Sequence, residues 1–345
     1  MRKSVLLFFL IFISLPSIAQ QLSGKILGEE NLPLYGATIY FDGTTIGTTT
    51  DENGYFELNL KTFPNGKLII SHVGYETVYL DEFISPISLS LQPTALALNE
   101  VILEPIPFSR KELIKAFREQ FLGKSSFAKK CRIVNEEVIQ FAYLNKDFKL
   151  SAFATDKIKI RNEELGYEIE VELITFDVFF TKRKLNDKYL KSSYFAVYSF
   201  FKELEGIDKS IVKNRESAYL GSSRQFFSNL VKNKWGSDDF LLVEGRKALE
   251  PKKHFEISKQ NEWHLIRLKL DKSEEATFDV KSFLKLFNLV YQKKSKSIVY
   301  FKTPEFTVDS FGNHSHHDQI YFSGELSKKR FGDMLPLDYS YRSKK

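Results

Sequence analysis

The stretch that decides the fold of the N-terminal part of the chain is GTTIGTTTDENGYF, residues 43–56. Threonine and isoleucine dominate its first half, an Asp-Glu-Asn-Gly sequence follows, and Tyr55 begins a second run of apolar residues. β-branched and aromatic residues favour extended backbone, and Asn-Gly supplies the positive φ angles of a tight turn. The stretch therefore predicts two strands joined as a hairpin.

Short apolar runs on both sides of this stretch continue the β pattern. Turn residues such as Pro33 and Gly36 separate them. Short strands with turn signals about every 8–12 residues are typical of a β-sandwich. We therefore predict an all-β sandwich over residues 22–103, with further strands at 22–27, 37–41, 67–73, 77–80, 87–91 and 98–103.

These residues, together with the segment LIISHVGY at 68–75, resemble the carboxypeptidase-like regulatory domain. That family has a transthyretin-like (prealbumin-like) sandwich and is common at the N-termini of Bacteroidetes envelope proteins. The resemblance covers residues 22–103. It implies a module that accompanies other domains, and it implies no activity.

The first residues have the three parts of a secretory signal peptide. Arg2 and Lys3 form the charged part, residues 5–15 form an apolar core, and Ser17 and Ala19 suit a cleavage site. We expect cleavage after Ala19 and export to the periplasm or the outer membrane. The alternative, a membrane anchor, is disfavoured because the apolar run is short for a spanning helix, and we expect no transmembrane segment after cleavage.

Composition excludes some classes of protein. The chain has 345 residues, of which 43% are hydrophobic, which is enough for two domain cores. Loss of Arg2 and Lys3 lowers the formal net charge from +6 to +4, too little to indicate a nucleic-acid partner. Cys131 is the single cysteine, so no disulfide can form within the chain.

A linker and a helix separate the two predicted domains. Pro105 and Pro107 disfavour helix and keep the chain extended. Ser109 and Glu112 then form a capping box, followed by an apolar helix face that includes Phe117. A second helical segment is predicted at about 214–234, where Gly221 either kinks it or splits it in two.

The remainder reads as strands. Residues 167–173 alternate strictly between apolar and acidic side chains, which predicts a strand with one buried and one solvated face. Together these patterns predict a signal peptide at 1–19, the sandwich at 22–103, a linker at 104–110, and an α+β domain with a mainly antiparallel sheet at 111–345.

Two segments of this second domain carry a further resemblance. The sequence NRESAYLGSSRQFF at 214–227 and the ending at 322–339 are similar to the uncharacterised C-terminal region of the same Bacteroidetes envelope proteins. The resemblance implies architecture and compartment, and it carries over no active-site residue.

The chain lacks the motifs of the enzymes and transporters that contain such a module. A zinc carboxypeptidase needs a histidine and a glutamate close in sequence, and none of the six histidines has a glutamate three residues on. We do not expect a TonB-dependent transporter, whose plug and roughly twenty membrane strands need more residues. No phosphate loop, serine elbow or Cys/His nucleophile pattern is present in the sequence. A Ser-His-Asp arrangement of distant residues stays open.

One local cluster has metal-ligating residue types: His314, His316 and His317, with Asp309 and Asp318 nearby. Alternate residues of an extended loop can point two imidazoles in the same direction. A Gly-Asn pair just before them, however, indicates an exposed turn where histidines are solvated. We expect no metal and no cofactor, with these three histidines as the candidates if a metal binds.

Arg215, Tyr219 and Arg224 are the candidates for lining a cleft, because two arginines on a helix can clamp an anion. The alternative is that both arginines pair with acidic strand residues and tie helix to sheet.

Two functions from different classes follow. We favour a non-catalytic envelope protein with a binding, structural or assembly role, whose partners are envelope proteins or glycans. The alternative is a hydrolase with its active site in the second domain, which a deep pocket with buried titratable groups would favour.

Overall fold

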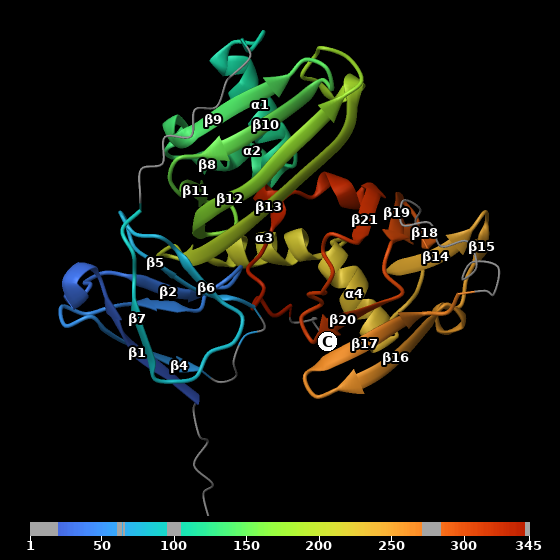
Figure 1. Cartoon of the computed structure of the whole chain (residues 1–345). Coiled ribbons are helices and arrows are strands. Elements are labelled where there is room, and N and C mark those ends of the chain that lie inside the picture. Colours follow the sequence, from blue (N-terminus) through green and yellow to red (C-terminus); the bar gives the residue numbers. More distant parts are fainter. Residues whose placement is uncertain (1–19, 61–63, 65, 95–104, 271–283, 342–345) are drawn as a thin grey trace, which may run out of the picture. The chain divides into compact units, whose positions relative to one another are not determined.

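The computed structural model describes residues 20–60, 64, 66–94, 105–270 and 284–341 (Figure 1). The predicted signal peptide and the strand predicted at 98–103 lie outside these residues. The chain divides into two compact units: Met1–Ile39 with Gly47–Leu96, and Tyr40–Ile46 with Ala97–Lys345.

The first unit is all-β, as predicted. One sheet has the order β4-β1-β7, in which β1 pairs antiparallel with β4 and parallel with β7. A second sheet has the order β3-β2-β5-β6. Leu22 and Ile26 of β1 and Ile69 of β5 are fully buried between neighbouring strands. The strands are β1 (Gln20–Leu27), β2 (Thr38–Phe41), β3 (Gly47–Thr49), β4 (Tyr55–Leu60), β5 (Leu68–Ser71), β6 (Val78–Leu80) and β7 (Ile87–Ser90).

The hairpin predicted at residues 43–56 is wrong, although both its strands and its turn exist. β3 pairs with β2 and β4 pairs with β1, so the turn passes from one sheet to the other. The Asp51 carboxylate accepts hydrogen bonds from the N–H groups of Asn53 and Tyr55, and Gly54 has φ +76°. A Cβ at Gly54 would lie 2.5 Å from the carbonyl oxygen of Ile26. The glycine is therefore required both by its φ and by this close approach.

The segment Tyr40–Ile46 belongs to the second unit by its contacts. The Gly43 N–H donates to the Ser199 carbonyl at 2.7 Å, and the Leu337 N–H donates to the Gly43 carbonyl at 2.7 Å. Thr45 donates its hydroxyl to the Asp338 carboxylate at 2.5 Å. Backbone and side-chain hydrogen bonds therefore hold this segment within the second unit.

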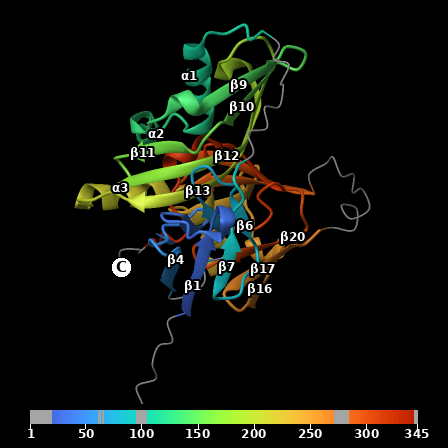
Figure 2. The ribbon, with the colours of Figure 1, turned by 60° about the vertical axis from the view of Figure 1, so that its left-hand side comes forward.

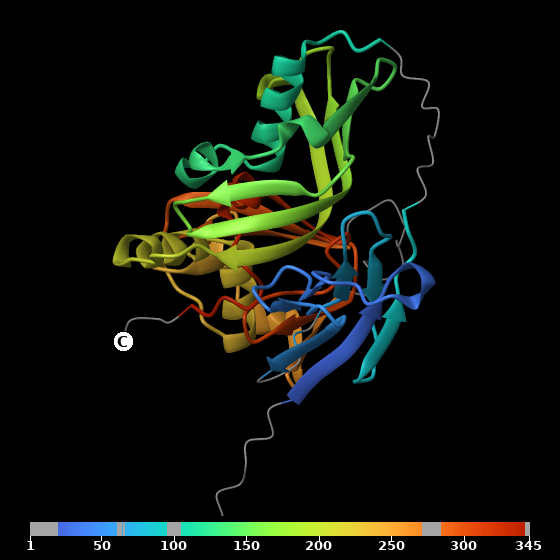
Figure 3. The ribbon, with the colours of Figure 1, turned by 90° about the vertical axis from the view of Figure 1, so that its left-hand side faces the viewer.

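The second unit begins with two helices and a six-stranded sheet. Its strand order is β8-β11-β12-β10-β9, and β13 pairs along β12 from Tyr167↔Glu203 to Phe180↔Leu190. Figures 2 and 3 show α1 lying on one face of this sheet. The elements are α1 (Arg110–Phe121), α2 (Ser126–Lys130), β8 (Arg132–Ile133), β9 (Ile139–Leu144), β10 (Lys149–Ala154), β11 (Ile158–Asn162), β12 (Tyr167–Phe180) and β13 (Leu190–Glu203).

Helix α1 confirms the predicted capping box. The Ser109 side chain accepts from the Glu112 N–H, and the Glu112 carboxylate accepts from the Ser109 N–H at 2.8 Å. Phe117 and Phe121 are fully buried against the sheet, and their rings stack 5.1 Å apart. The helix therefore starts where its cap places it and is held by its apolar face.

The rest of the second unit surrounds a second core. A five-stranded sheet has the order β15-β14-β18-β19-β21, and a three-stranded sheet has the order β16-β17-β20. Phe226, Phe227 and Leu230 of α4 are buried in this core. The strands are antiparallel, as expected. The elements are α3 (Lys209–Tyr219), α4 (Ser223–Lys232), β14 (Phe240–Glu244), β15 (Lys247–Ala248), β16 (Phe255–Gln260), β17 (Trp263–Leu268), β18 (Lys285–Tyr291), β19 (Ser295–Phe301), β20 (Glu305–Asp309) and β21 (Ile320–Gly324).

The predicted helical segment at 214–234 is split in two. Gly221 takes φ +69° between the helices, and the Ser222 side chain accepts from the Gln225 N–H to cap α4. Helix α3 starts earlier than predicted because the Asp208 carboxylate accepts from the Ile211 N–H. In the described part of the chain, no helix has both the length and the apolar character needed to cross a membrane.

Candidate functional site

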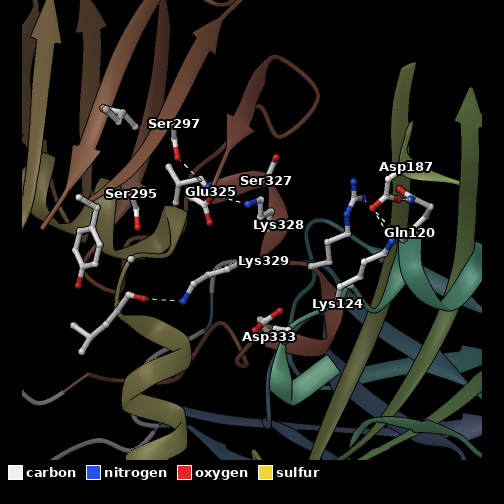
Figure 4. A pocket seen from close by; sticks show the side chains of 18 of the residues that line it. Gln120, Lys124, Asp187, Ser295, Ser297, Glu325, Ser327, Lys328, Lys329 and Asp333 are labelled. Atoms are coloured by element: carbon white, nitrogen blue, oxygen red, sulfur yellow. Dashed lines mark hydrogen bonds and ion pairs between the residues drawn. The ribbon is translucent and has the colours of Figure 1, made fainter. Parts of the chain in front are cut away.

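A cavity of about 580 Å³ lies within the second unit. Its walls are the C-terminal end of α1, strands β14, β18 and β19, and the segment at residues 325–333, which contains the short 3-10 helices η5 (Leu326–Lys328) and η6 (Phe331–Asp333) (Figure 4). Eight charged side chains line it in equal numbers of each sign: Glu119, Asp187, Glu325 and Asp333, and Lys124, Lys328, Lys329 and Arg330.

The sequence of η6 fixes one wall of the cavity. Phe331 is buried and its ring stacks on Phe121 at 4.9 Å. The Gly332 N–H donates to the Leu122 carbonyl at 2.9 Å, and a Cβ at Gly332 would lie 2.7 Å from the Cα of Ala128. Only glycine allows this approach, which sets η6 against the end of α1 and against α2.

Two of the lysines form ion pairs with carboxylates of the same cavity. Lys124 contacts Glu119 at 2.8 Å and Asp187 at 2.6 Å, and Lys328 contacts Glu325 at 2.5 Å. Burial lowers the pKa of Lys124, but hydrogen bonds to Asp187 and Glu119 outweigh this effect and leave it raised. These carboxylates are therefore engaged with the protein.

The other two cations bind backbone carbonyls. Lys329 donates to the carbonyls of Ala218 and Leu220, each at 2.7 Å, and so caps the C-terminal end of α3. Burial lowers the pKa of Lys329, and the nearby Asp333 opposes this. Arg330 donates to the Gln120 carbonyl at 2.9 Å. All four cations of the cavity thus have partners.

Gln120 and Asp333 are the two buried polar side chains of the cavity that keep unpartnered acceptors. They are 5% and 7% exposed, and within the described residues neither Gln120 Oε1 nor Asp333 Oδ2 has a hydrogen-bond partner. Gln120 Nε2 donates to Asp187 Oδ1 at 3.0 Å, which fixes the orientation of the amide. Burial raises the pKa of Asp333, opposed by a hydrogen bond from Ser125 and by Lys329.

An apolar wall faces these polar groups. It consists of Leu220, Phe240, Leu289, Tyr291 and Leu326. The Tyr291 ring lies 4.7 Å from the Phe240 ring, and a Cβ at Gly221 would come within 3.0 Å of it. Figure 4 shows Ser295 and Ser297 on this strand side of the cavity, with Lys124, Asp187 and Gln120 on the other.

Of the residues predicted to line a cleft, Arg215 ties α3 to the first sheet of the unit. It is 7% exposed and donates to the Leu165 carbonyl at 2.8 Å. It also pairs with Glu203 of β13 at 2.6 Å, and its guanidinium lies 4.0 Å above the Tyr167 ring. Tyr219 is buried and stacks on Tyr341 at 4.7 Å.

Arg224, the third of these residues, binds four backbone carbonyls. Its guanidinium donates to Leu335, Pro336, Leu337 and Tyr339 at 2.8–3.4 Å. The structure thus brings neither arginine into the cavity: Arg215, Tyr219 and Arg224 all lie outside its lining.

The histidine cluster packs onto α4. The His314 ring lies 4.3 Å from Phe227 and 4.5 Å from His317, and its Nδ1 lies 2.8 Å from the Ser315 carbonyl. Burial, and secondarily His317, lowers the pKa of His314 from 6.5 to about 3. His316 and His317 are exposed. Across the described residues, no three His, Cys, Asp or Glu side chains are grouped so as to hold a metal ion.

No sequence pattern predicted the cavity. One signal was available: Gln120 stands on the same face of α1 as Leu113, Phe117 and Phe121, where a polar side chain is unexpected. The hydrogen-bond partner of that side chain, Asp187, lies 67 residues further along the chain, so no local sequence pattern indicates the contact.

Comparison with known proteins identifies the N-terminal module. Residues 22–103 match the family model of the CarboxypepD_reg-like domain, which confirms the resemblance seen in the sequence. The match includes the segment Tyr40–Ile46 and ends at residue 103, before the helices of the second unit.

Two curated relatives match part of the chain. The chain is 31% identical over 95 residues to the TonB-dependent receptor SusC of Bacteroides thetaiotaomicron, covering 27% of this chain and 9% of the receptor. It is 29% identical over 102 residues to the TonB-dependent receptor P39 of Formosa agariphila, covering 29% and 10%. The chain thus spans about a tenth of the length of these relatives.

Among solved structures, a 9R-lipoxygenase from Cyanothece PCC8801 aligns with 66% of this chain and 50% of its own at 10% identity. Its TM-score of 0.16 supports no inference.

Proposed function

We propose that this protein is exported and acts in the cell envelope without catalysis, using its second unit to bind a ligand or partner. The comparisons support the envelope as the compartment, because both curated relatives are TonB-dependent receptors. The signal peptide expected from residues 1–19 supports export. The partners we propose are envelope proteins or glycans.

The observation that carries a binding role is the state of the charged groups in the cavity. Its four cations and three of its carboxylates are engaged in ion pairs or with backbone carbonyls. A nucleophilic serine or cysteine requires an adjacent base, and the described residues lining the cavity include no histidine and no cysteine. Such a lining is suited to holding a molecule rather than to proton transfer.

A hydrolase is the second candidate, and one observation favours it. Asp333 is buried in the cavity with a raised pKa, as a general acid would be. Glycoside hydrolysis, for example, uses two carboxyl groups in different roles. The other three carboxylates of the cavity are paired with lysines, so the binding role ranks first.

The experiment that tests this proposal is an activity assay on the purified mature chain. It is incubated with C-terminally varied peptides, with and without zinc, beside a variant carrying His314→Ala, His316→Ala and His317→Ala. We expect no turnover in any sample. Zinc-dependent cleavage that disappears in the triple variant would overturn the non-catalytic role. Fractionation of the cells should place the protein in the envelope, and recovery from the cytosol would overturn the compartment.

A further inference from the structure

We propose that the segment at residues 182–191, which connects β12 to the start of β13, binds the anionic phosphate headgroups of a lipid membrane. We call this segment the basic loop. The inference goes beyond the binding role proposed above and adds a lipid surface to its partners. It joins three observations: exposed cations without carboxylate partners, a tyrosine ring that gathers three of them, and apolar side chains at the same end of the sheet.

The basic loop concentrates the positive charge of the chain. Its five cations and one carboxylate give it a net charge of +4, whereas the whole chain has a formal net charge of +6. The carboxylate, Asp187, already pairs with Lys124 at 2.6 Å and accepts from Gln120. Among the described residues, none of the five cations forms an ion pair, so they are open to an external anion. These exposed cations are Lys182, Arg183, Lys184, Lys188 and Lys191.

The Tyr189 ring gathers three of these lysines. The ammonium groups of Lys182, Lys184 and Lys188 lie 5.5, 5.7 and 5.8 Å from the centroid of the ring. The Thr181 N–H donates to the Tyr189 carbonyl at 2.7 Å, which ties the ring to the end of β12. Three like charges around one ring repel one another, and an anion that binds among them relieves this repulsion. The basic loop thus presents clustered charge to phosphate groups.

Apolar side chains at the same end of the sheet favour a membrane over a soluble polyanion. Leu144 is the last residue of β9 and is 46% exposed. It lies opposite Lys149 of β10, which in turn lies opposite Phe179, just before the basic loop. The Lys149 ammonium is 5.6 Å from the Phe179 ring. A soluble polyanion needs cations only, whereas a bilayer interface also takes up apolar and aromatic side chains beside lysines. The combination therefore fits a lipid surface.

The test is sedimentation of the purified mature chain with lipid vesicles. One set of vesicles contains phosphatidylcholine alone, and the other contains equal parts of phosphatidylcholine and phosphatidylglycerol. We expect binding to the anionic vesicles only. Binding should be lost as salt rises from about 0.1 M to about 1 M, because the screening length falls from about 10 Å to about 3 Å. Equal binding to both sets of vesicles, or binding to neither, would overturn the inference.

Two matched double variants locate the binding. Lys184→Gln with Lys188→Gln should weaken binding to anionic vesicles about thirtyfold, which is about fivefold for each lysine. Lys209→Gln with Lys213→Gln removes two exposed lysines of α3 at the same spacing and should leave binding unchanged.

The control lysines are remote from the basic loop. Helix α3 follows the opposite end of β13, and the 14 residues of that strand span about 45 Å, several screening lengths. Equal effects of the two double variants would mean that net charge alone attracts the protein, and would overturn the basic loop as the site.

A soluble polyanion separates a lipid surface from phosphate chemistry in general. Leu144→Gln should weaken vesicle binding about fivefold and leave the binding of polyphosphate unchanged, because only the membrane takes up the exposed leucine. If polyphosphate binds the natural chain as tightly as the vesicles do, and Leu144→Gln changes neither affinity, the partner is a soluble polyanion and the lipid surface is overturned.

These outcomes are distinct from those that test the proposed function. Failure to bind vesicles would overturn this inference and leave the non-catalytic envelope role standing. Turnover in the peptide assay would overturn the non-catalytic role and leave the lipid surface standing. Recovery of the protein from the cytosol, with vesicle binding intact, would overturn the compartment alone.

Discussion

At the scale of single residues, the two arginines of α3 and α4 show how buried and partly buried cations are used in this protein. Arg215 binds one carboxylate and backbone carbonyls, whereas Arg224 binds carbonyls of residues 335–339. A planar guanidinium can donate to several acceptors at once, and a lysine ammonium cannot reproduce that geometry. Both arginines hold segments of chain together in the described structure.

Arg224→Lys should destabilise the second unit by about 1–3 kcal/mol, because one ammonium cannot reach four carbonyls. Urea denaturation measures the loss, and limited proteolysis should show faster cleavage around residues 335–341. Arg118→Lys is the matched control. Arg118 pairs with Glu136 at the surface, where the same change should cost under about 1 kcal/mol. Equal effects would contradict the role of Arg224.

His314 should make the protein less stable in acid. Its pKa in the folded protein is lowered to about 3 from 6.5, so below pH 6.5 the unfolded chain binds a proton that the folded chain does not. The neutral His314 side chain makes its full contribution to the unfolding free energy above pH 6.5, and this contribution is lost as the pH falls towards 3. In His314→Phe, the dependence of the unfolding free energy on pH should be shallower across that window.

Phe306→Leu separates this titration from packing. Phe306 packs on Phe227, as His314 does, but it carries no titratable group. The change should lower stability by a similar amount at every pH. If His314→Phe keeps the full pH dependence of the natural chain, His314 does not cause it.

At the scale of elements, the loop after β20 is fixed to the start of α4 by a glycine. Gly312 has φ +88°, and a Cβ there would lie 2.1 Å from the Arg224 carbonyl oxygen. The Asp309 carboxylate accepts from the N–H groups of Phe311 and Asn313 and shapes the same loop. The loop thus lies directly against helix backbone.

Gly312→Ala should therefore destabilise the protein by about 1–3 kcal/mol more than Gly206→Ala. Gly206 also has positive φ, at +76°, but a Cβ there would meet no atom within 4 Å. Both variants carry the conformational cost of a left-handed alanine, and Gly312→Ala alone carries the overlap. Chemical denaturation of the two variants gives the difference, and equal losses would refute the close contact.

Local patterns predicted most of the elements. The Ser109 cap, the break at Gly221 and the alternating strand at 167–173 depend on neighbours in sequence and were found. The hairpin at 43–56 was wrong because turn residues show where the chain reverses, not which strand it then pairs with. Pairing with β1 and β2 is decided by the packing of both sheets.

At the scale of the whole molecule, the candidate site was beyond sequence reasoning for a physical reason. Arg215 and Arg224 look like ligand-binding residues in sequence, yet carbonyls from distant segments occupy both. In the sequence, Gln120 looks like an ordinary helix residue. In the fold it bonds to Asp187 and lines a cavity together with the segment at 325–333. Which polar groups are satisfied is a property of the folded chain alone.

Export should remove the first nineteen residues, because Ser17 and Ala19 suit the cleavage site that follows the apolar core. Intact-mass measurement of the mature protein from the envelope fraction should give Gln20 as the first residue. An Ala19→Arg variant should accumulate with the leader attached. A mature protein that retains residues 1–19 on the membrane would refute cleavage.

The contact of η6 with α1 can form only late in synthesis, because η6 is made about 210 residues after the end of α1. Arg330 bonds to Gln120 across 210 positions, and Phe331 completes the core that Phe121 begins. Closing so long a loop is slow, and during synthesis the first core must wait, incomplete, for nearly all of the second to emerge. A chain halted before residue 325 therefore has neither a finished first core nor a complete cavity, so the cavity forms only in one of the last steps of folding.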